Sequence, residues 1–229
     1  MRTELIEKLV ALCCEKPFDV IKIQNFITEN ALNSEEVTKA SIDICEYGNF
    51  DYGYYLYDNE KEPNADELKT YNWDKLFDVL IDNGLDATLV FCYNGKDYEN
   101  ILDSIRYIDN GTMGASILRN VLNKGGDPNI EIDSHPFFEE IDSDFVMDID
   151  MNLFDEKWRL DVAFRFWIVL IGFGGYIKDH QCPVKMKNGF STDIFKDFEK
   201  FDYRIDRNQK DWTMYIFLKE NSTVVATLS

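Results

Sequence analysis

The sequence is organised around a short pattern of apolar pairs followed by a glycine, which occurs three times. Each copy has apolar residues at positions i, i+1, i+4 and i+5 and a glycine three residues later. The copies begin at Leu76, Ile117 and Phe166, and their glycines are Gly84, Gly125 and Gly174. Apolar residues at this spacing form one face of an α-helix, and a glycine just beyond it favours the left-handed position that ends a helix. The pattern therefore predicts a helix that recurs along the chain.

A weaker copy near the N-terminus has Ile23 and Ile27 on its apolar face and Ala31 in the position of the glycine. The interval between copies varies, which predicts insertions in loops between helices of constant design. Self-similarity at this scale is typical of stacked helix pairs, because one pair alone cannot bury its apolar face.

The apolar spacing and the Gly and Pro breaks predict four helix pairs, which are 3–14 with 18–30, 35–47 with 67–83, 97–109 with 113–124, and 136–150 with 156–172. Asn33 and Ser34 are N-cap candidates for the third helix, and His135-Pro136 opens the helix over 136–150. Residues 48–66 lack periodicity and are predicted to form a long loop or a short hairpin. Residues 85–96 are predicted to be a loop that turns at Tyr93-Asn94-Gly95-Lys96.

The pattern changes after residue 175. Asn188-Gly189 predicts a β-hairpin, and the stretches 203–206, 212–218 and 223–228 have the composition of strands. A small antiparallel sheet here would cover the exposed end of the helical core, as terminal units of solenoids do. We therefore expect a mainly α fold with two parts, a helical array over 1–175 and a β-rich cap over 176–229.

One copy of the pattern extends as Val121-Leu122-Asn123-Lys124-Gly125-Gly126-Asp127-Pro128-Asn129. This segment resembles the second half of an ankyrin repeat, in which the second helix ends in Leu-Leu-x-x-Gly-Ala-Asp-x-Asn. The resemblance covers about 18–175 and is strongest over 73–132. It departs from the family because no Thr-Pro-Leu-His opens a first helix, the spacing exceeds about 33 residues, and Tyr176 replaces the Asp of the last copy. The resemblance implies a degenerate, bacterial-type ankyrin-like solenoid that binds proteins through its inner helices and loops, without catalysis.

The composition is strongly acidic, with 43 Asp and Glu against 24 Lys and Arg, for a net charge of −19. Such a surface repels nucleic acid and anionic membranes and favours a basic protein partner, although solubility alone also explains it. The sequence has neither a signal peptide pattern nor an apolar run near the length of a membrane span, so we expect a cytoplasmic protein. The cysteines lack Cys-x-x-Cys spacing and are predicted to be core residues in a reducing compartment; they are Cys13, Cys14, Cys45, Cys92 and Cys182.

No metal or cofactor site is predicted. Asp148, Asp150 and Asn152 match the first ligands of an EF-hand loop, but Leu153 and Arg159 stand where that loop needs Gly and Glu. The only histidines, His135 and His180, lack ligand spacing, and a nucleophilic pair of Cys182 with His180 lacks an orienting third group. The glycines at 172–175 follow a helix and lack the Lys-Ser/Thr of a phosphate loop, so they are predicted to stop the helix. We therefore expect no catalysis.

The most promising binding feature is a tyrosine-rich stretch flanked by acids. Exposed tyrosines offer a large contact area at low entropic cost, so this stretch predicts a protein-binding surface. Alternatively, the alternating tyrosines form a hairpin edge that packs on the neighbouring helix pair. The candidate binding residues, with two more from the turn of the next loop, are Asp51, Tyr52, Tyr54, Tyr55, Tyr57, Tyr93 and Asp97.

These observations favour a non-catalytic module that binds a basic protein through its concave face and loops. A narrower hypothesis is an immunity protein that neutralises a toxin, because acidic proteins with degenerate ankyrin-like repeats resemble that class. A hypothesis of a different class is a carboxylate-based hydrolase with its cleft between the array and the C-terminal sheet. A third is a subunit of a larger assembly, which would expose an apolar patch on its end helices.

Overall fold

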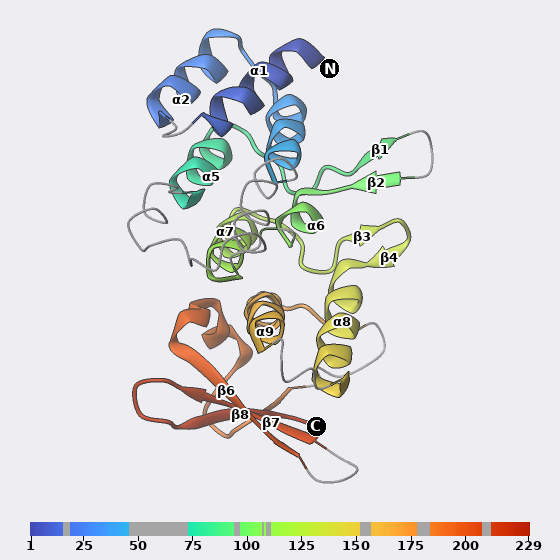
Figure 1. The fold of residues 1–229 in the computed structure, drawn as a ribbon, viewed down its shortest axis with the longest axis vertical. Helices are drawn as coiled ribbons and strands as arrows, with labels where there is room; N and C mark the ends of the chain where they lie inside the picture. The colour runs from blue at the N-terminus through green and yellow to red at the C-terminus, as the bar shows by residue number, and fades with distance from the viewer. Residues whose placement is uncertain are drawn as a thin grey trace, which may run out of the picture. The chain divides into compact units, whose positions relative to one another are not determined.

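The computed structural model describes residues 1–15, 19–45, 73–93, 97–106, 108, 111–151, 157–177, 184–207 and 212–229. These residues form two compact units, Met1–Asp127 and Pro128–Ser229. The chain is mostly helical and ends in a four-stranded antiparallel sheet, which confirms the predicted fold class at this level (Figure 1). None of the described helices is long and apolar enough to cross a membrane.

The first unit contains helices joined by one short hairpin. Its helices are α1 Thr3–Cys14, α2 Val20–Glu29, an unlabelled helix over 34–45, α5 Trp73–Asp82, α6 Ile101–Ile105 and α7 Gly111–Asn123. The hairpin consists of β1 Phe91–Tyr93 and β2 Asp97–Glu99. Helix α2 packs on α1 and on α5, and α7 packs on α5 and on α6.

The second unit contains a helix pair and the C-terminal sheet. Its helical elements are α8 Phe137–Met151, α9 Lys157–Gly172 and the 3-10 helix η2 Thr192–Lys200. Its strands are β3 Glu131–Ile132, β4 His135–Pro136, β5 Lys185–Met186, β6 Phe201–Arg207, β7 Trp212–Leu218 and β8 Val224–Leu228. The predicted boundary after residue 175 lies inside this unit, where η2 packs on α9. The division into 1–175 and 176–229 stays a prediction.

The repeated helix ends have the predicted left-handed C-cap. The cap residues all have positive φ: Ala31 46°, Gly84 109°, Gly125 106° and Gly174 90°. In each case the next residue's N–H donates to a carbonyl five residues earlier, which is the Schellman arrangement. These bonds are Leu32 N to Ile27 O at 3.1 Å, Leu85 N to Leu80 O at 3.0 Å, Gly126 N to Val121 O at 3.2 Å and Gly175 N to Leu170 O at 2.8 Å. The sequence pattern thus marks one recurring backbone structure.

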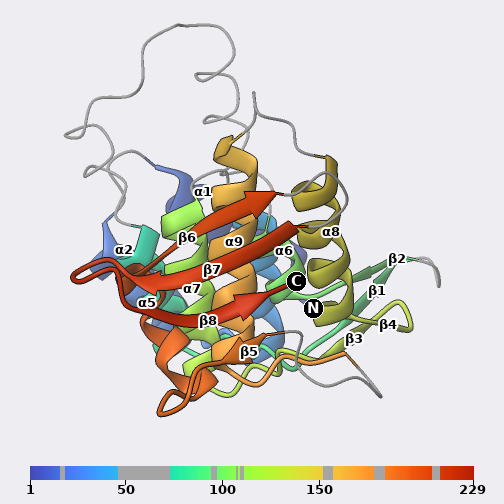
Figure 2. The ribbon, with the colours of Figure 1, turned by 90° about the horizontal axis from the view of Figure 1, so that it is seen from below.

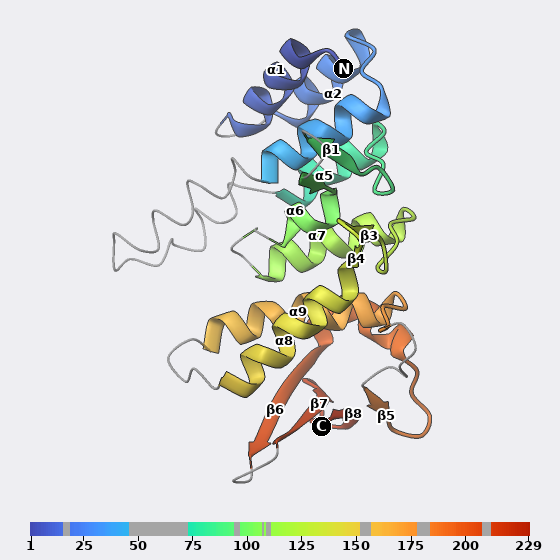
Figure 3. The same cartoon turned by 90° about the vertical axis from the view of Figure 1, so that its right-hand side faces the viewer.

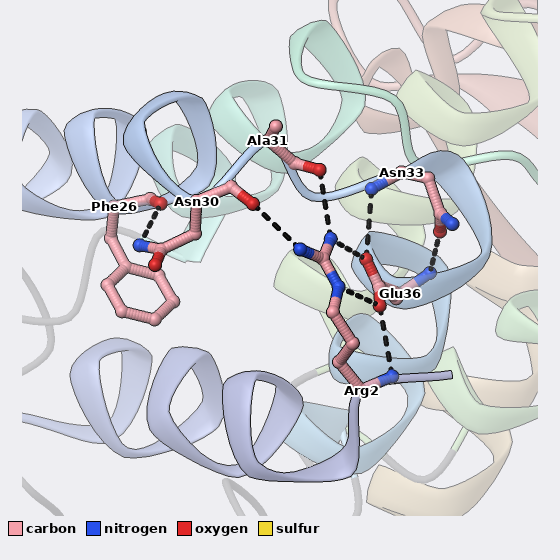
Figure 4. A network of polar contacts seen from close by, with 6 residues as sticks. All are labelled: Arg2, Phe26, Asn30, Ala31, Asn33 and Glu36. Atoms are coloured by element: carbon pink, nitrogen blue, oxygen red, sulfur yellow. Dashed lines mark hydrogen bonds and ion pairs between the residues drawn. The ribbon is translucent and has the colours of Figure 1, made fainter.

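Three of these caps are also held by polar side chains from elsewhere in the same unit. The carbonyl of each cap residue accepts a side-chain hydrogen bond. These bonds are Arg2 Nη2 to Ala31 O (2.9 Å), Ser34 Oγ to Gly84 O, and Asn129 Nδ2 to Gly174 O (3.1 Å). The backbone N–H two residues after each cap donates to a side-chain oxygen. These bonds are Asn33 N to Glu36 (3.2 Å), Asp86 N to Thr38 (2.8 Å) and Tyr176 N to Asn129 (2.9 Å). Figure 4 shows the first of these contacts, between Arg2, Ala31, Asn33 and Glu36. Side chains here satisfy backbone groups that helix ends leave without intrahelical partners.

The order helix, left-handed cap, hairpin, helix occurs twice, once from α5 to α6 and once from α7 to α8. The predicted helix over 97–109 is wrong at both ends, because residues 97–99 form β2 and α6 ends at Ile105. Strand pairing with β1 takes the first residues, and the Asn100 side chain caps α6 by accepting from Leu102 N at 2.9 Å. Likewise His135-Pro136 does not open α8 but forms β4, and α8 begins at Phe137.

The sheet of the second unit has the strand order β5-β8-β7-β6 (Figure 2). Helices α8 and α9 lie on one side of it (Figure 3), where the Tyr203 ring on β6 lies 4.6 Å from that of Phe164 on α9. The hairpin predicted at Asn188-Gly189 is wrong, because β5 pairs with the distant β8. Beyond the turn the chain enters η2, whose Phe195 and Phe198 are buried.

The apolar faces predicted from the repeat form the core of each unit. All four apolar positions of each full copy are buried, and Trp167 is fully buried. Cys13 and Cys45 are core residues as predicted, but Cys92 is exposed because it lies on the hairpin. Cys182 lies outside the described residues.

Candidate protein-binding surface

The predicted binding residues divide into two groups. Asp51, Tyr52, Tyr54, Tyr55 and Tyr57 lie outside the described residues, so the structure does not test them. Tyr93 and Asp97 lie on β1 and β2 and pair with each other at the outer end of the hairpin ladder. The structure thus joins these two residues at backbone level, on the β1–β2 hairpin.

The hairpin displays one uncharged face. Phe91 pairs with Glu99 and Cys92 pairs with Tyr98. Opposite partners in a ladder share a face, so Cys92 and Tyr98 lie on the same face, and Val90 lies immediately before β1. All three are exposed, Val90 to 39% and Tyr98 to 40% of the full residue area. We name these three residues the hairpin face.

An ion-pair cluster fixes the base of the hairpin. Lys39 Nζ, on the helix over 34–45, lies 3.0 Å from a carboxylate oxygen of Glu99 on β2 and 2.5 Å from one of Asp43. The Lys39 side chain is only 14% exposed. Burial raises the pKa of Asp43, while the Lys39 ammonium opposes that shift and the Glu99 charge adds to it. The lysine therefore bridges two acids and ties β2 to the helix.

Asn100 holds the other side of the base. Its buried amide donates from Nδ2 to the carbonyls of Ala87 at 2.9 Å and Leu89 at 2.8 Å, just before β1. Its Oδ1 accepts from Leu102 N, at the start of α6. One side chain therefore fixes the entry to β1 and the exit from β2. A surface held in this way loses little conformational entropy when a partner binds.

The described side chains show no comparable chemical site. They contain no group of three or more His, Cys, Asp or Glu placed to hold a metal ion. Among their carboxyl groups, Asp43 and Asp142 have raised pKa values because of burial, and they lie in different units. Asp142 accepts from the indole N–H of Trp167 at 2.8 Å, and His135 is exposed on β4. The EF-hand match at Asp148 to Arg159 lies largely among side chains outside the description.

The prediction missed the hairpin face itself. Its signal is present in the sequence as a run of β-forming residues on either side of Asn94-Gly95, with Val90 and Cys92 before it and Tyr98 after it. That arrangement is a hairpin signature. The helical spacing of Ile101, Leu102 and Ile105 favoured a helix that began at residue 97, over the residues that form β2.

Comparison with known proteins adds no assignment. Searches against protein-family models, curated proteins and solved structures find no match to this chain. The resemblances to ankyrin repeats and to immunity proteins therefore stay predictions.

Proposed function

We propose that this chain is a non-catalytic protein-binding module whose hairpin face contacts the partner. The observation that carries the proposal is the combination of an exposed, uncharged face of Val90, Cys92 and Tyr98 with a base fixed by Lys39 and Asn100. Interfaces are depleted of charge at their centres and enriched in tyrosine, which is the composition of this face.

A basic partner fits the charge of the molecule. The chain carries a net charge of −19, and acids lie close to the hairpin face at Glu99 and Asp43. Long-range attraction would bring a basic protein to such a surface quickly, while the uncharged face would supply contact area. The same charge disfavours nucleic acid and anionic membranes.

The proposal includes an ankyrin-like arrangement of the helices. Its support is the recurring Schellman cap at Ala31, Gly84, Gly125 and Gly174 and the twofold order of helix, cap, hairpin and helix. It also includes a reducing cytoplasmic location, supported by Cys13, whose thiol is buried in the core. An immunity protein that binds a basic toxin is a narrower form of the same proposal.

The test is affinity capture from the native host lysate at low salt, with wild-type protein and a V90S/Y98A variant. Both side chains are exposed, so the variant should fold like the wild type. We expect the wild-type protein to retain a specific basic protein from the lysate. When both components are purified, the variant should bind this partner at least tenfold more weakly, because interface anchors each contribute more than about 1 kcal/mol.

A matched control is Tyr176→Ala, which removes a tyrosine that is 51% exposed on the second unit. This control should bind like the wild type. Equal binding by all three proteins would remove the hairpin face from the interface, and a Y54A/Y55A variant would then test the tyrosine-rich segment.

A further inference from the structure

A groove open to solvent runs between α1 and α2 in the first unit. It encloses about 660 Å³, and its apolar lining comes from Ala11, Leu12, Ile21 and Phe26. Ile21 is 65% exposed, more than any other large apolar residue in the described part of the chain. Met1 and Met147 follow, each at 61%. Large apolar side chains in a groove commonly mark a binding surface.

The α2 wall of the groove carries a polarised charge pattern. Four of its lining residues are Lys22, Asn25, Phe26 and Glu29, and residues at i, i+3, i+4 and i+7 lie along one side of a helix. This stripe has a positive charge at one end, uncharged side chains in the middle and a negative charge at the other end. The α1 wall contributes Lys8, Ala11 and Leu12, and Asp19, the N-cap of α2, completes the lining.

This pattern is complementary to a reversed copy of itself. We propose that the chain forms a symmetric dimer in which α2 of one copy lies antiparallel to α2 of the other, along the α1–α2 groove. Reversal places Lys22 opposite Glu29 of the partner copy, and the twofold axis repeats that pair. Asn25 and Phe26 meet at the centre, and the exposed Ile21 of each copy becomes covered.

The existing contacts of these residues permit this exchange. Lys22 Nζ lies 2.8 Å from Glu15, but both side chains are about half exposed, at 52% and 53%. Such surface pairs contribute little to stability, so the pair yields readily to an intermolecular one. The hairpin face is not part of the groove, so this inference does not depend on the proposed function.

The test is sedimentation velocity over a wide range of protein concentrations at fixed ionic strength. We expect a reversible dimer for the wild type. K22E and E29K should each weaken dimerisation roughly tenfold, because each turns two attractive pairs into two repulsive ones. The double variant K22E/E29K restores opposite charges and should dimerise within about threefold of the wild type.

Net charge cannot produce this result, because K22E makes the chain more acidic and E29K makes it less acidic. Lys124→Glu is the matched control, since Lys124 is an exposed lysine that pairs with Asp82 away from the groove. I21A should also weaken the dimer, without changing any charge. A wild type that stays monomeric at all concentrations, or a dimer that is indifferent to K22E and E29K, would overturn the proposal.

Discussion

Glu36 shows how a single residue combines a local and a long-range role. It follows Asn33 at capping-box spacing, and each binds the other's backbone N–H, at 2.9 Å and 3.2 Å. Arg2 adds a two-pronged contact, with Nε 2.7 Å and Nη2 2.5 Å from the two carboxylate oxygens. The Glu36 side chain is 2% exposed, so a buried carboxylate joins the chain's second residue to the start of a helix.

Glu36 predicts acid sensitivity with a definite sign. Hydrogen bonds from the Arg2 side chain hold the pKa of Glu36 at about 2, below its ordinary value of 4.5. Because the folded-state pKa is the lower one, the pair stabilises fully above about 4.5 and its contribution is lost as the pH falls towards 2. We expect E36Q, which keeps the capping contact, to be less stable than wild type at pH 7 by urea unfolding. The difference should shrink below pH 4.5; a constant difference down to pH 2 would contradict the assignment.

Asp142 gives the opposite electrostatic case. Burial raises the pKa of its carboxyl, and Trp167, which opposes that shift, donates to it inside the α8–α9 pair. D142N keeps an oxygen acceptor and removes the buried charge, so its free energy of unfolding at pH 7 should be close to that of wild type or higher. D142L leaves the indole N–H without an acceptor and should cost about 1–3 kcal/mol. Urea unfolding of both variants separates the contribution of the hydrogen-bond acceptor from that of the charge. Equal losses of unfolding free energy in the two variants would show that only packing matters.

Neither of these residues could be paired from the sequence. Arg2 and Glu36, like Asp142 and Trp167, are separated along the chain and meet only because helices pack. The capping role of Asn33 was predictable, because an N-cap acts on residues two or three positions away.

At the scale of the element, the repeated cap is a conformational requirement. Gly125 has a φ of 106°, and a Cβ there would meet nothing within 4 Å, so Gly125→Ala changes only the backbone preference. Ala31 has the same cap with a φ of 46° and a side chain that disfavours it. We expect G125A to lower and A31G to raise the free energy of unfolding by about 1 kcal/mol each, because non-glycine residues resist the left-handed region. Thermal unfolding of both checks this; shifts of the same sign would contradict the shared cap.

The same contrast explains what was predictable among the elements. The caps at Gly84, Gly125 and Gly174 depend on a local pattern, and the structure has all three. The partner of β5 is β8, which lies about forty residues later in the chain. The Asn188-Gly189 turn carries no information about this distant pairing. The β1–β2 hairpin was missed although its turn was recognised, because the apolar spacing after Asn100 favoured a longer helix than the α6 that forms.

Within the hairpin, the sequence predicted binding by the outer pair of Tyr93 and Asp97, and it did not predict the hairpin face. The residues that the structure exposes, Val90 and Tyr98, became visible only once strand alternation assigned faces. Exposure is a property of the packed structure, since the base of the hairpin depends on Lys39 and Asn100 from other elements.

At the scale of the whole molecule, net charge opposes the folded state. A charge of −19 repels itself in a compact chain, while salt bridges such as Arg2–Glu36 act in the opposite direction. Several described salt bridges are exposed on both sides, including Lys8–Glu4 and Lys200–Asp197, and such pairs contribute little. We infer that repulsion among the excess acidic charges outweighs attraction within the salt bridges.

This balance predicts that salt stabilises the protein. Raising NaCl from about 10 to 300 mM shortens the screening length from roughly 30 Å to under 10 Å, which weakens repulsion between distant acids more than attraction within a buried pair. The Tm should rise by a few degrees, and KCl should act like NaCl because screening does not depend on the ion. Measuring the E29K variant alongside separates this effect from self-association through α2, since that variant should dimerise roughly tenfold more weakly. A Tm that falls with salt would mean that the ion pairs outweigh the repulsion, and the acidic surface would then have to be explained by its partner alone.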